Sequence, residues 1–211
     1  NPIFGSSFGI NYTSQENILD ESFFQLHRQI SPVGRLLHEI IKSTDAEKNE
    51  NDQYEIAGVT PSQYIKTELN YIKHWQLSTE TVLALRAFGG VAIPFGNAEN
   101  IPFNRSYFSG GANDNRGWRA YQLGPGSSTN LNEFNEANLK LTFNLEYRFP
   151  FIGNMSAAFF IDAGNIWNVL DNVNDPTYRF DGLQDLNEIA VGTGFGLRYD
   201  FDFFVFRLDT G

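Results

Sequence analysis

The segment 101–127 combines residue types that a solvent-exposed loop does not require. Repeated glycines mark it as irregular backbone rather than a strand or helix. The glycines are Gly110, Gly111, Gly117, Gly124 and Gly126. The same segment has three arginines, Arg105, Arg116 and Arg119, and five aromatic residues. We therefore expect this loop to fold back and pack against the rest of the protein, where a buried arginine needs a partner of opposite charge.

Composition argues against several kinds of site elsewhere in the chain. The sequence has no cysteine, so it can form neither a disulfide nor a thiolate metal site. Its three histidines, His27, His38 and His74, do not have the spacing of metal ligands. The formal net charge of −10 argues against binding to nucleic acid. We expect no metal, cofactor or catalytic residue.

The segment 138–151 shows the clearest secondary-structure pattern. Every odd position from Leu139 to Phe151 is a large apolar residue, while the even positions up to Arg148 are polar or charged. This alternation indicates a β-strand with one apolar face. A typical soluble strand has about five or six residues, whereas a membrane strand needs roughly 9–11. The length therefore favours a transmembrane β-strand with one face toward lipid.

Eight such segments are predicted, and their connections alternate in length. The strands are expected at 2–13, 23–30, 63–77, 81–95, 138–151, 155–166, 189–199 and 203–209. The short connections are 14–22, 78–80, 150–154 and 200–202, and the long ones are 31–62, 96–137 and 167–188. This alternation is typical of outer-membrane barrels, with short periplasmic turns and long extracellular loops. A helical turn is expected at 35–42.

The loop motif resembles a known family. Tyr107-Phe108-x-Gly110-Gly111, followed by Arg116-Gly117-Trp118, is similar to the (Y/F)xGG…(V/I)RG(F/Y) loop of BamA/TamA-type outer-membrane barrels. The sequence departs from this pattern at Asn115, where the family has an apolar residue, and at Trp118, where it has Phe or Tyr.

Three further motifs follow in the order that this family has. Residues 160–167 (FIDAGNIW) resemble its FxDxGxxW strand, and residues 145–150 (LEYRFP) resemble the strand after the loop. Residues 194–199 (GFGLRY), together with 207–209 (RLD), resemble its GxGLRY…RxD hairpin. Residues 122–128 (QLGPGSS) are closer to the TamA-like TamL proteins of the Bacteroidetes than to BamA.

The resemblance implies an all-β fold, the C-terminal half of a sixteen-stranded transmembrane antiparallel β-barrel with an inward-folded extracellular loop. Residues 1–211 would form one partial barrel domain, strands eight to fifteen of that barrel. The closing strand and the periplasmic POTRA domains would lie outside this chain. Because the interior of an eight-stranded barrel only holds its own side chains, we expect that these strands do not close on themselves around such a bulky loop.

The resemblance also implies a function without active-site chemistry. Such a barrel opens a seam whose strand edges template incoming strands, and thereby inserts or exports proteins at the bacterial outer membrane. Its partners would be outer-membrane lipids, nascent outer-membrane proteins, and TamB-like proteins or lipoproteins in the periplasm. Two alternatives remain, an export pore of the two-partner-secretion type and a passive porin.

The resemblance places the loop-tip arginine, here Arg116, inside the lumen against acids of the barrel wall. Glu146 and Asp162 are the candidates, and strand parity independently puts both on the polar face. Gly117 and Trp118 complete the tip, Gly110 and Gly111 belong to the same loop, and Gly192, Gly194 and Gly196 would clear space for it. Arg198 and Asp209 are interpreted as ordinary wall charges. Trp75, Trp167 and Tyr199 are assigned to an interfacial aromatic belt.

Overall fold

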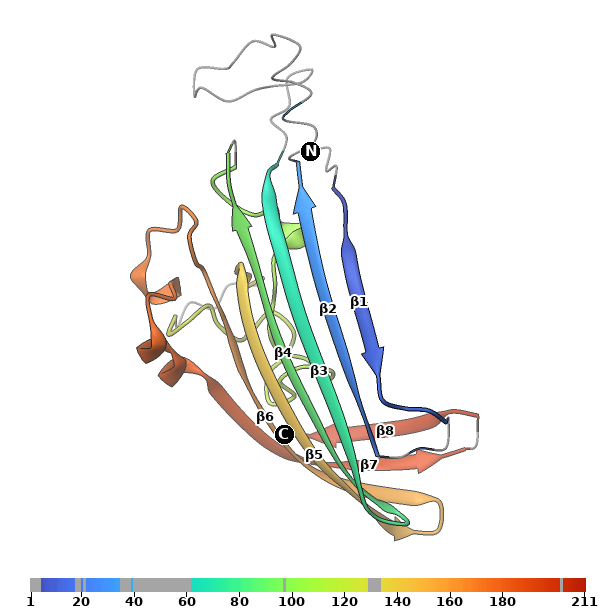
Figure 1. Cartoon of the computed structure of the whole chain (residues 1–211). Helices are drawn as coiled ribbons and strands as arrows, with labels where there is room; N and C mark the ends of the chain where they lie inside the picture. Colours follow the sequence, from blue (N-terminus) through green and yellow to red (C-terminus); the bar gives the residue numbers. More distant parts are fainter. Residues whose placement is uncertain are drawn as a thin grey trace.

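The eight strands form one curved antiparallel sheet in a computed structural model of the chain (Figure 1). The structure describes residues 5–17, 20, 22–34, 39, 62–96, 98–128, 134–201 and 203–211. The order of strands across the sheet is their order in the sequence, so every strand pairs with its sequence neighbours. This up-and-down topology is that expected of a transmembrane barrel wall.

The bounds of the strands agree with the alternating pattern to within a few residues at most ends. The strands are β1 Phe8–Thr13, β2 Phe23–Val33, β3 Tyr64–Ser78, β4 Thr81–Pro94, β5 Leu139–Ile152, β6 Met155–Trp167, β7 Ala190–Asp200 and β8 Val205–Thr210. The largest difference is at β1, predicted from residue 2, since only its part from Phe8 is a described strand. The predicted alternation of short turns and long loops is confirmed.

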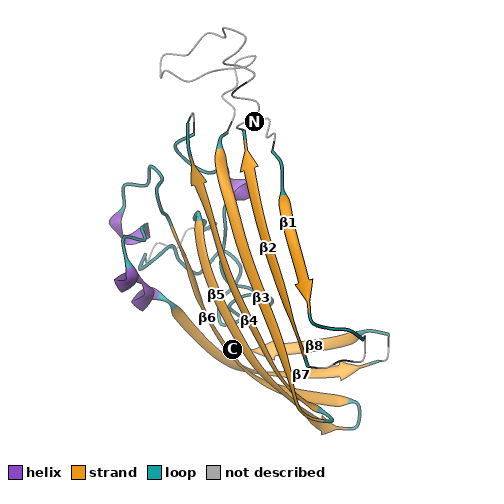
Figure 2. Cartoon of the chain, viewed as in Figure 1, coloured by secondary structure: helices purple, strands orange, loops and turns teal. Residues whose placement is uncertain are grey.

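The helical elements whose bounds lie in the described part of the chain are short 3₁₀ turns in the long loops (Figure 2). They are η1 Phe103–Arg105, η2 Pro176–Tyr178 and η3 Leu183–Glu188. The helical turn expected at 35–42 lies outside the described residues, apart from residue 39.

None of the described helices has the length and apolarity needed to span a bilayer.

The two faces of the sheet differ in polarity as the sequence predicts. Phe143 and Tyr147 on β5 are about two-fifths exposed, while Thr142 and Glu146, the residues directly before them, are buried. The register places Phe143 beside Ala87 and Ala163, and Glu146 beside Ala84 and Phe160. Leu139, Leu141, Phe143 and Leu145 therefore share one outward face, and the polar side chains line the inward face. This arrangement confirms the membrane-strand prediction.

The sheet does not close on itself. In the described residues β1 pairs only with β2, and β8 pairs only with β7 (Figure 1). The prediction that these eight strands form an open wall is therefore confirmed. Both edge strands carry backbone N–H and C=O groups that are available for a further strand.

The long loop between β4 and β5 returns along the inward face of the sheet. Figure 1 shows most of this loop, in green to yellow-green, beside the strands, and only its first residues extend past the end of β4. Two isolated β-bridges, Tyr107 with Ala137 and Ser109 with Leu123, hold the loop to itself. Tyr107 also packs with Ile166 and Phe88 on the wall, so the loop is anchored at its base by apolar contacts.

Candidate functional site

Arg116, at the tip of this loop, is held by two carboxylates of the barrel wall. Its Nε and Nη2 atoms donate to the two oxygens of Asp162 on β6, both at 2.8 Å. Its Nη1 atom donates to Oε2 of Glu146 on β5 at 2.5 Å. The backbone N–H of Arg116 also donates to Asp162, at 3.0 Å. A two-pronged guanidinium–carboxylate contact of this kind fixes orientation as well as charge.

This contact is buried. The Arg116 side chain is 7% exposed, that of Glu146 9% and that of Asp162 0%. The guanidinium carbon also lies 3.5 Å from the centre of the Phe160 ring, in cation–π geometry. Burial disfavours the charged guanidinium, but hydrogen bonds and charge from Asp162 and Glu146 outweigh it and raise the pKa of Arg116 above its ordinary value.

The strand register explains why these acids meet the loop. Residues at even positions of β5 point inward, and Asn144 lies opposite Asp162 in the β5–β6 pairing. Asn144 donates one amide hydrogen to Asp162 at 2.9 Å and another to the backbone carbonyl of Asp114 at 2.8 Å. The structure thus brings together Arg116, Glu146 and Asp162, the three residues that the sequence singled out from separate segments.

Four more charged residues complete what we call the inner ion cluster. It consists of Arg116, Arg148, Arg198, Arg207, Glu146, Asp162 and Asp209. Glu146 is 2.6 Å from Arg148 and 2.8 Å from Arg198, so three arginines share one carboxylate. Asp209 lies 3.1 Å from Arg207 and 3.5 Å from Arg116. Arg198 and Asp209, interpreted from sequence as ordinary wall charges, are thus members of the network around Arg116.

A second polar anchor holds the loop just before its tip. Asp114 accepts hydrogen bonds from Ser109, Thr142 and the backbone of Gly110, and its carboxylate is 3.0 Å from Lys140. Sequence reasoning missed this anchor. The available signal was Lys140, a base on the inward face of β5 that required an acid from somewhere in the chain.

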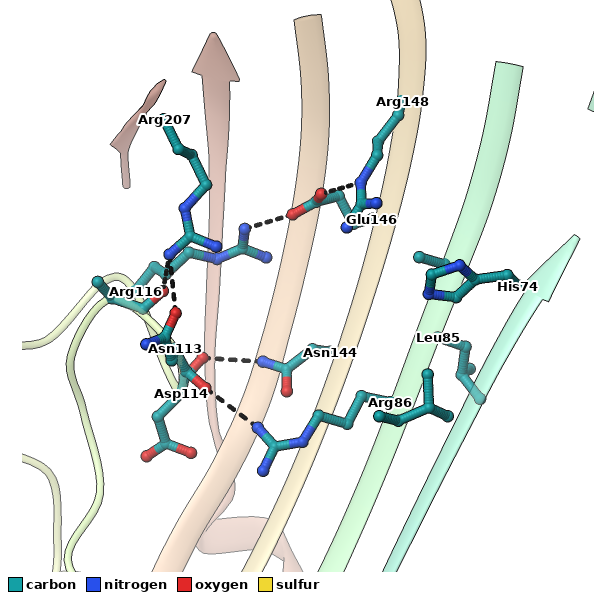
Figure 3. A pocket seen from close by; sticks show the side chains of 13 residues that line it. His74, Leu85, Arg86, Asn113, Asp114, Arg116, Asn144, Glu146, Arg148 and Arg207 are labelled. Atoms are coloured by element: carbon teal, nitrogen blue, oxygen red, sulfur yellow. Dashed lines mark hydrogen bonds and ion pairs between the residues drawn. The ribbon is translucent and has the colours of Figure 1, made fainter. Parts of the chain in front are cut away.

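Two wall arginines hold the tip through its backbone. Arg86 on β4 donates to the carbonyl of Asn113 at 3.0 Å, and Arg207 on β8 donates to that of Ala112 at 2.7 Å. Figure 3 shows these arginines reaching the tip from opposite sides, with Arg116 directed toward Glu146 between them. The tip therefore bridges strands that are distant from one another in the sheet.

The loop glycines allow a tight turn that other residues would strain. Gly110 and Gly111 have φ angles of 97° and 103°, in the left-handed region. A Cβ at Gly110 would also lie 2.2 Å from the carbonyl oxygen of Arg119. The N–H of Gly111 donates to the carbonyl of Trp118 at 2.8 Å, which closes the hairpin of the tip.

The glycine row of β7 accommodates the loop at one position only. A Cβ at Gly192 would lie 3.0 Å from the Trp118 ring and 3.6 Å from Gly117. Gly194 instead faces Phe160, and Gly196 faces Asp209 and Arg198. The expectation that all three glycines clear space for the loop is therefore wrong at Gly194 and Gly196, which make room for wall side chains.

Asn115 and Trp167 are both buried, and the side chain of each donates a hydrogen bond. Asn115, which replaces an apolar residue of the family motif, is fully buried and donates to the carbonyl of Gly164 at 3.3 Å. Trp167 is 0% exposed, and its indole N–H donates to Glu188 at 2.8 Å. The assignment of Trp167 to an interfacial belt is wrong, because the β6–β7 loop covers it. Trp75 and Tyr199 are both 38% exposed on the outward face.

The arrangement is suited to holding the loop rather than to transforming a substrate. Most of the charged groups around Arg116 face a group of opposite charge within 4 Å. Within the described ranges, no group of three His, Cys, Asp or Glu side chains is placed to hold a metal ion. The chemical capacity of the site is that of a buried electrostatic latch between loop and wall.

The comparisons with known proteins agree with this geometry. Residues 49–211 match the family model described as the Omp85 superfamily domain. The crystal structure of BamA from Haemophilus ducreyi lacking POTRA domains 1–3 is similar to this chain with a TM-score of 0.57 and 15% sequence identity. The match covers 99% of this chain and 50% of that one, so this chain spans half of its length. Among curated proteins, none matches the sequence.

Proposed function

The chain belongs to the Omp85 superfamily, and we propose that it is part of a sixteen-stranded barrel that inserts client proteins into the outer membrane, or exports them, without enzymatic chemistry. The protein is located in the bacterial outer membrane. In this proposal the described sheet is the C-terminal half of the barrel. Further strands complete the wall, and periplasmic POTRA domains precede it.

The observation that carries the proposal is the burial of Arg116 between Asp162 and Glu146. It holds a folded loop against the inner wall, where the loop occupies space that a passive porin would leave open to solutes. A porin is therefore the weaker alternative. The latch is instead consistent with a barrel in which the C-terminal half of the wall is held rigid by the loop while the seam between the first and last strands opens.

The seam would act through its strand edges. An unpaired edge in hydrocarbon is costly because its backbone groups lack hydrogen-bond partners. An incoming client strand can satisfy these groups by adding to the sheet. The proposed partners are therefore nascent outer-membrane proteins and lipids, with TamB-like proteins or lipoproteins on the periplasmic side. A TamA-like protein and a secretion pore would act on different client proteins. The barrel wall of this chain would serve in either.

The proposal is tested by reconstitution. The full-length protein is placed in liposomes, and the folding rate of a urea-denatured outer-membrane protein is followed by its shift in electrophoretic migration. We expect faster client folding than in empty liposomes, and a clear loss of this acceleration in Arg116→Ala. Arg119→Ala is the matched control, since Arg119 is in the same loop and is exposed. A wild-type protein that conducts ions but leaves client folding unchanged would instead support a porin.

A further inference from the structure

A single arginine interrupts the apolar outward face of β2. Its outward neighbours on the strand are Phe24, Leu26, Ile30 and Pro32. The register pairs Arg28 with Ile10 of β1 and Leu69 of β3, both exposed on the same face. The polar side chains of β2, such as His27 and Gln29, point to the opposite face, where they contact each other. Arg28 therefore faces lipid.

Arg28 and Lys73 are the two charged residues on the outward face of the eight described strands, and they differ in their surroundings. The Lys73 ammonium lies 5.7 Å from the ring centre of Phe24 and 5.8 Å from that of Trp75. The side chain of Arg28 has no hydrogen bond, ion pair or ring contact within the part of the chain that the structure describes. A charge at membrane depth is unfavourable unless it is paired or reaches the interface. The environment of Arg28 thus lacks an anion.

A hollow in the lipid-facing surface adjoins this arginine. Its volume is about 420 Å³, and its walls are mainly apolar: Thr67, Leu69, Val91, Leu139 and Leu141. Gly89 forms its floor, because it lies between Leu69 and Leu141 in the register and has no side chain. Glu68 also borders the hollow, but its carboxylate is 3.2 Å from Lys66, which points inward. The hollow therefore combines an apolar groove with one free cation.

The position of the hollow along the strands indicates which leaflet of the membrane it faces. Leu139 is the first residue of β5, and Val91 is three residues before the end of β4 at Pro94. Both ends adjoin the long loops, which are extracellular in barrels of this kind. The hollow thus lies in the half of the wall that faces the outer leaflet. Residues on the lipid-facing surface at this depth meet acyl chains and headgroups.

We propose that Arg28 and the Gly89 hollow bind one anionic, phosphate-bearing lipid of the outer leaflet. The phosphate pairs with the Arg28 guanidinium, whose planar set of donors matches phosphate oxygens. An acyl chain fills the groove over Gly89 and gains contact with Leu69 and Leu141. The lipid thereby supplies the missing partner of Arg28. The site is on the opposite face of the sheet from the inner ion cluster and does not depend on the proposed insertion activity.

The test is native mass spectrometry of the full-length protein released from detergent micelles with added lipid. The probes are phosphatidylglycerol and a phosphate-free galactosyl diacylglycerol with the same acyl chains. We expect one phosphatidylglycerol to be retained in preference to the galactolipid. In Arg28→Gln, retention of phosphatidylglycerol should weaken about tenfold, which is the loss expected for one charge-assisted contact.

Two further variants separate the parts of the site. Lys73→Gln should bind phosphatidylglycerol as the wild type does, because Lys73 already has aromatic partners. Gly89→Val should weaken binding of both lipids by filling the groove, and it should fold, since a Cβ there meets only Leu141 at 3.5 Å. Heat-modifiable migration checks that each variant is folded. Equal phosphatidylglycerol retention in wild type and Arg28→Gln, equal retention of both lipids, or a protein dimer that Arg28→Gln abolishes would each overturn the proposal.

Discussion

Arg116 and Asp162 are joined by three hydrogen bonds, two from the guanidinium and one from the backbone N–H of the same residue. The carboxylate therefore holds both the side chain and the main chain of the loop tip. This double contact distinguishes Asp162 from Glu146, which binds only the Arg116 side chain and is shared with Arg148 and Arg198. The two acids consequently have different mechanical roles in the latch.

Removal of Arg116 should release the loop while leaving the wall folded. Loss of one partner of a buried ion pair costs up to about 3–5 kcal/mol, and water in the barrel interior reduces that figure. In Arg116→Ala the segment 101–128 should become sensitive to external protease on intact cells, with unchanged heat-modifiable migration. Arg116→Lys should give partial protection only, because a lysine cannot make the two-pronged contact.

The exposed Arg119 provides the control for this experiment. Arg119→Ala should keep the loop as protected as in the wild type. Equal protease sensitivity of the Arg116→Ala and Arg119→Ala variants would mean that the ion pairs with Asp162 and Glu146 do not hold the loop.

Arg116 and Asp162 should behave as one energetic unit. Residues in direct contact show coupling of roughly 0.5–3 kcal/mol in double-mutant cycles. We therefore expect the double variant Arg116→Ala with Asp162→Asn to unfold in urea at nearly the same midpoint as Arg116→Ala alone. Additive shifts in the midpoint of unfolding would show that the two side chains act independently, contrary to the geometry.

Glu146→Gln should give a different result in the same assay. Neutralising this carboxylate leaves Arg116, Arg148 and Arg198 around a neutral amide, so their mutual repulsion acts on the wall itself. Its loss of stability should therefore persist when Arg116 is already alanine.

The second anchor makes Lys140 a loop-holding residue. Lys140 pairs with Asp114 at 3.0 Å and donates to the carbonyl of Phe108 at 2.7 Å. Lys140→Met should leave the buried Asp114 carboxylate without its cation, at a cost of about 1–3 kcal/mol, and should increase protease cleavage of the loop. Lys73→Met, on the outward face of β3, should not affect cleavage. Unchanged cleavage in Lys140→Met would assign the anchoring to the neutral donors around Asp114 alone.

Strand alternation and the family motif predicted the strands of the wall and the central residues of the inner ion cluster, and the reason is physical. Alternation leaves a strand one choice of face, so Glu146 had to point inward once Leu141 and Phe143 faced lipid. In the same way, Asp162 had to point inward once Phe159 and Ile161 on its own strand faced lipid. The prediction that both acids contact Arg116 came from the family resemblance, because the alternation of residues along a strand does not show where a loop lies.

The remaining contacts depend on how the loops fold over the wall. Asp114 is an ordinary loop residue by type, and only the positive φ of Gly110 and Gly111 turns the chain so that it meets Lys140. Trp167 ends a strand in the manner of a belt residue, yet the β6–β7 loop supplies Glu188 and buries it. Loop geometry of this kind is not encoded in a two-residue periodicity.

Docking of the loop tip on the inward wall is tested most directly by a cysteine cross-link between Gly117 and Gly192. A Cβ built at either glycine lies within 3.7 Å of the other's Cα, which is compatible with a disulfide, and this chain contains no cysteine that would compete. The full-length Gly117→Cys, Gly192→Cys protein should form the cross-link in intact cells, seen as a mobility shift that a reductant reverses. The pair Gly117→Cys with Gly153→Cys, at the β5–β6 turn, should not. Absence of the 117–192 cross-link in a folded, membrane-inserted protein would show that the tip lies elsewhere and would contradict the latch.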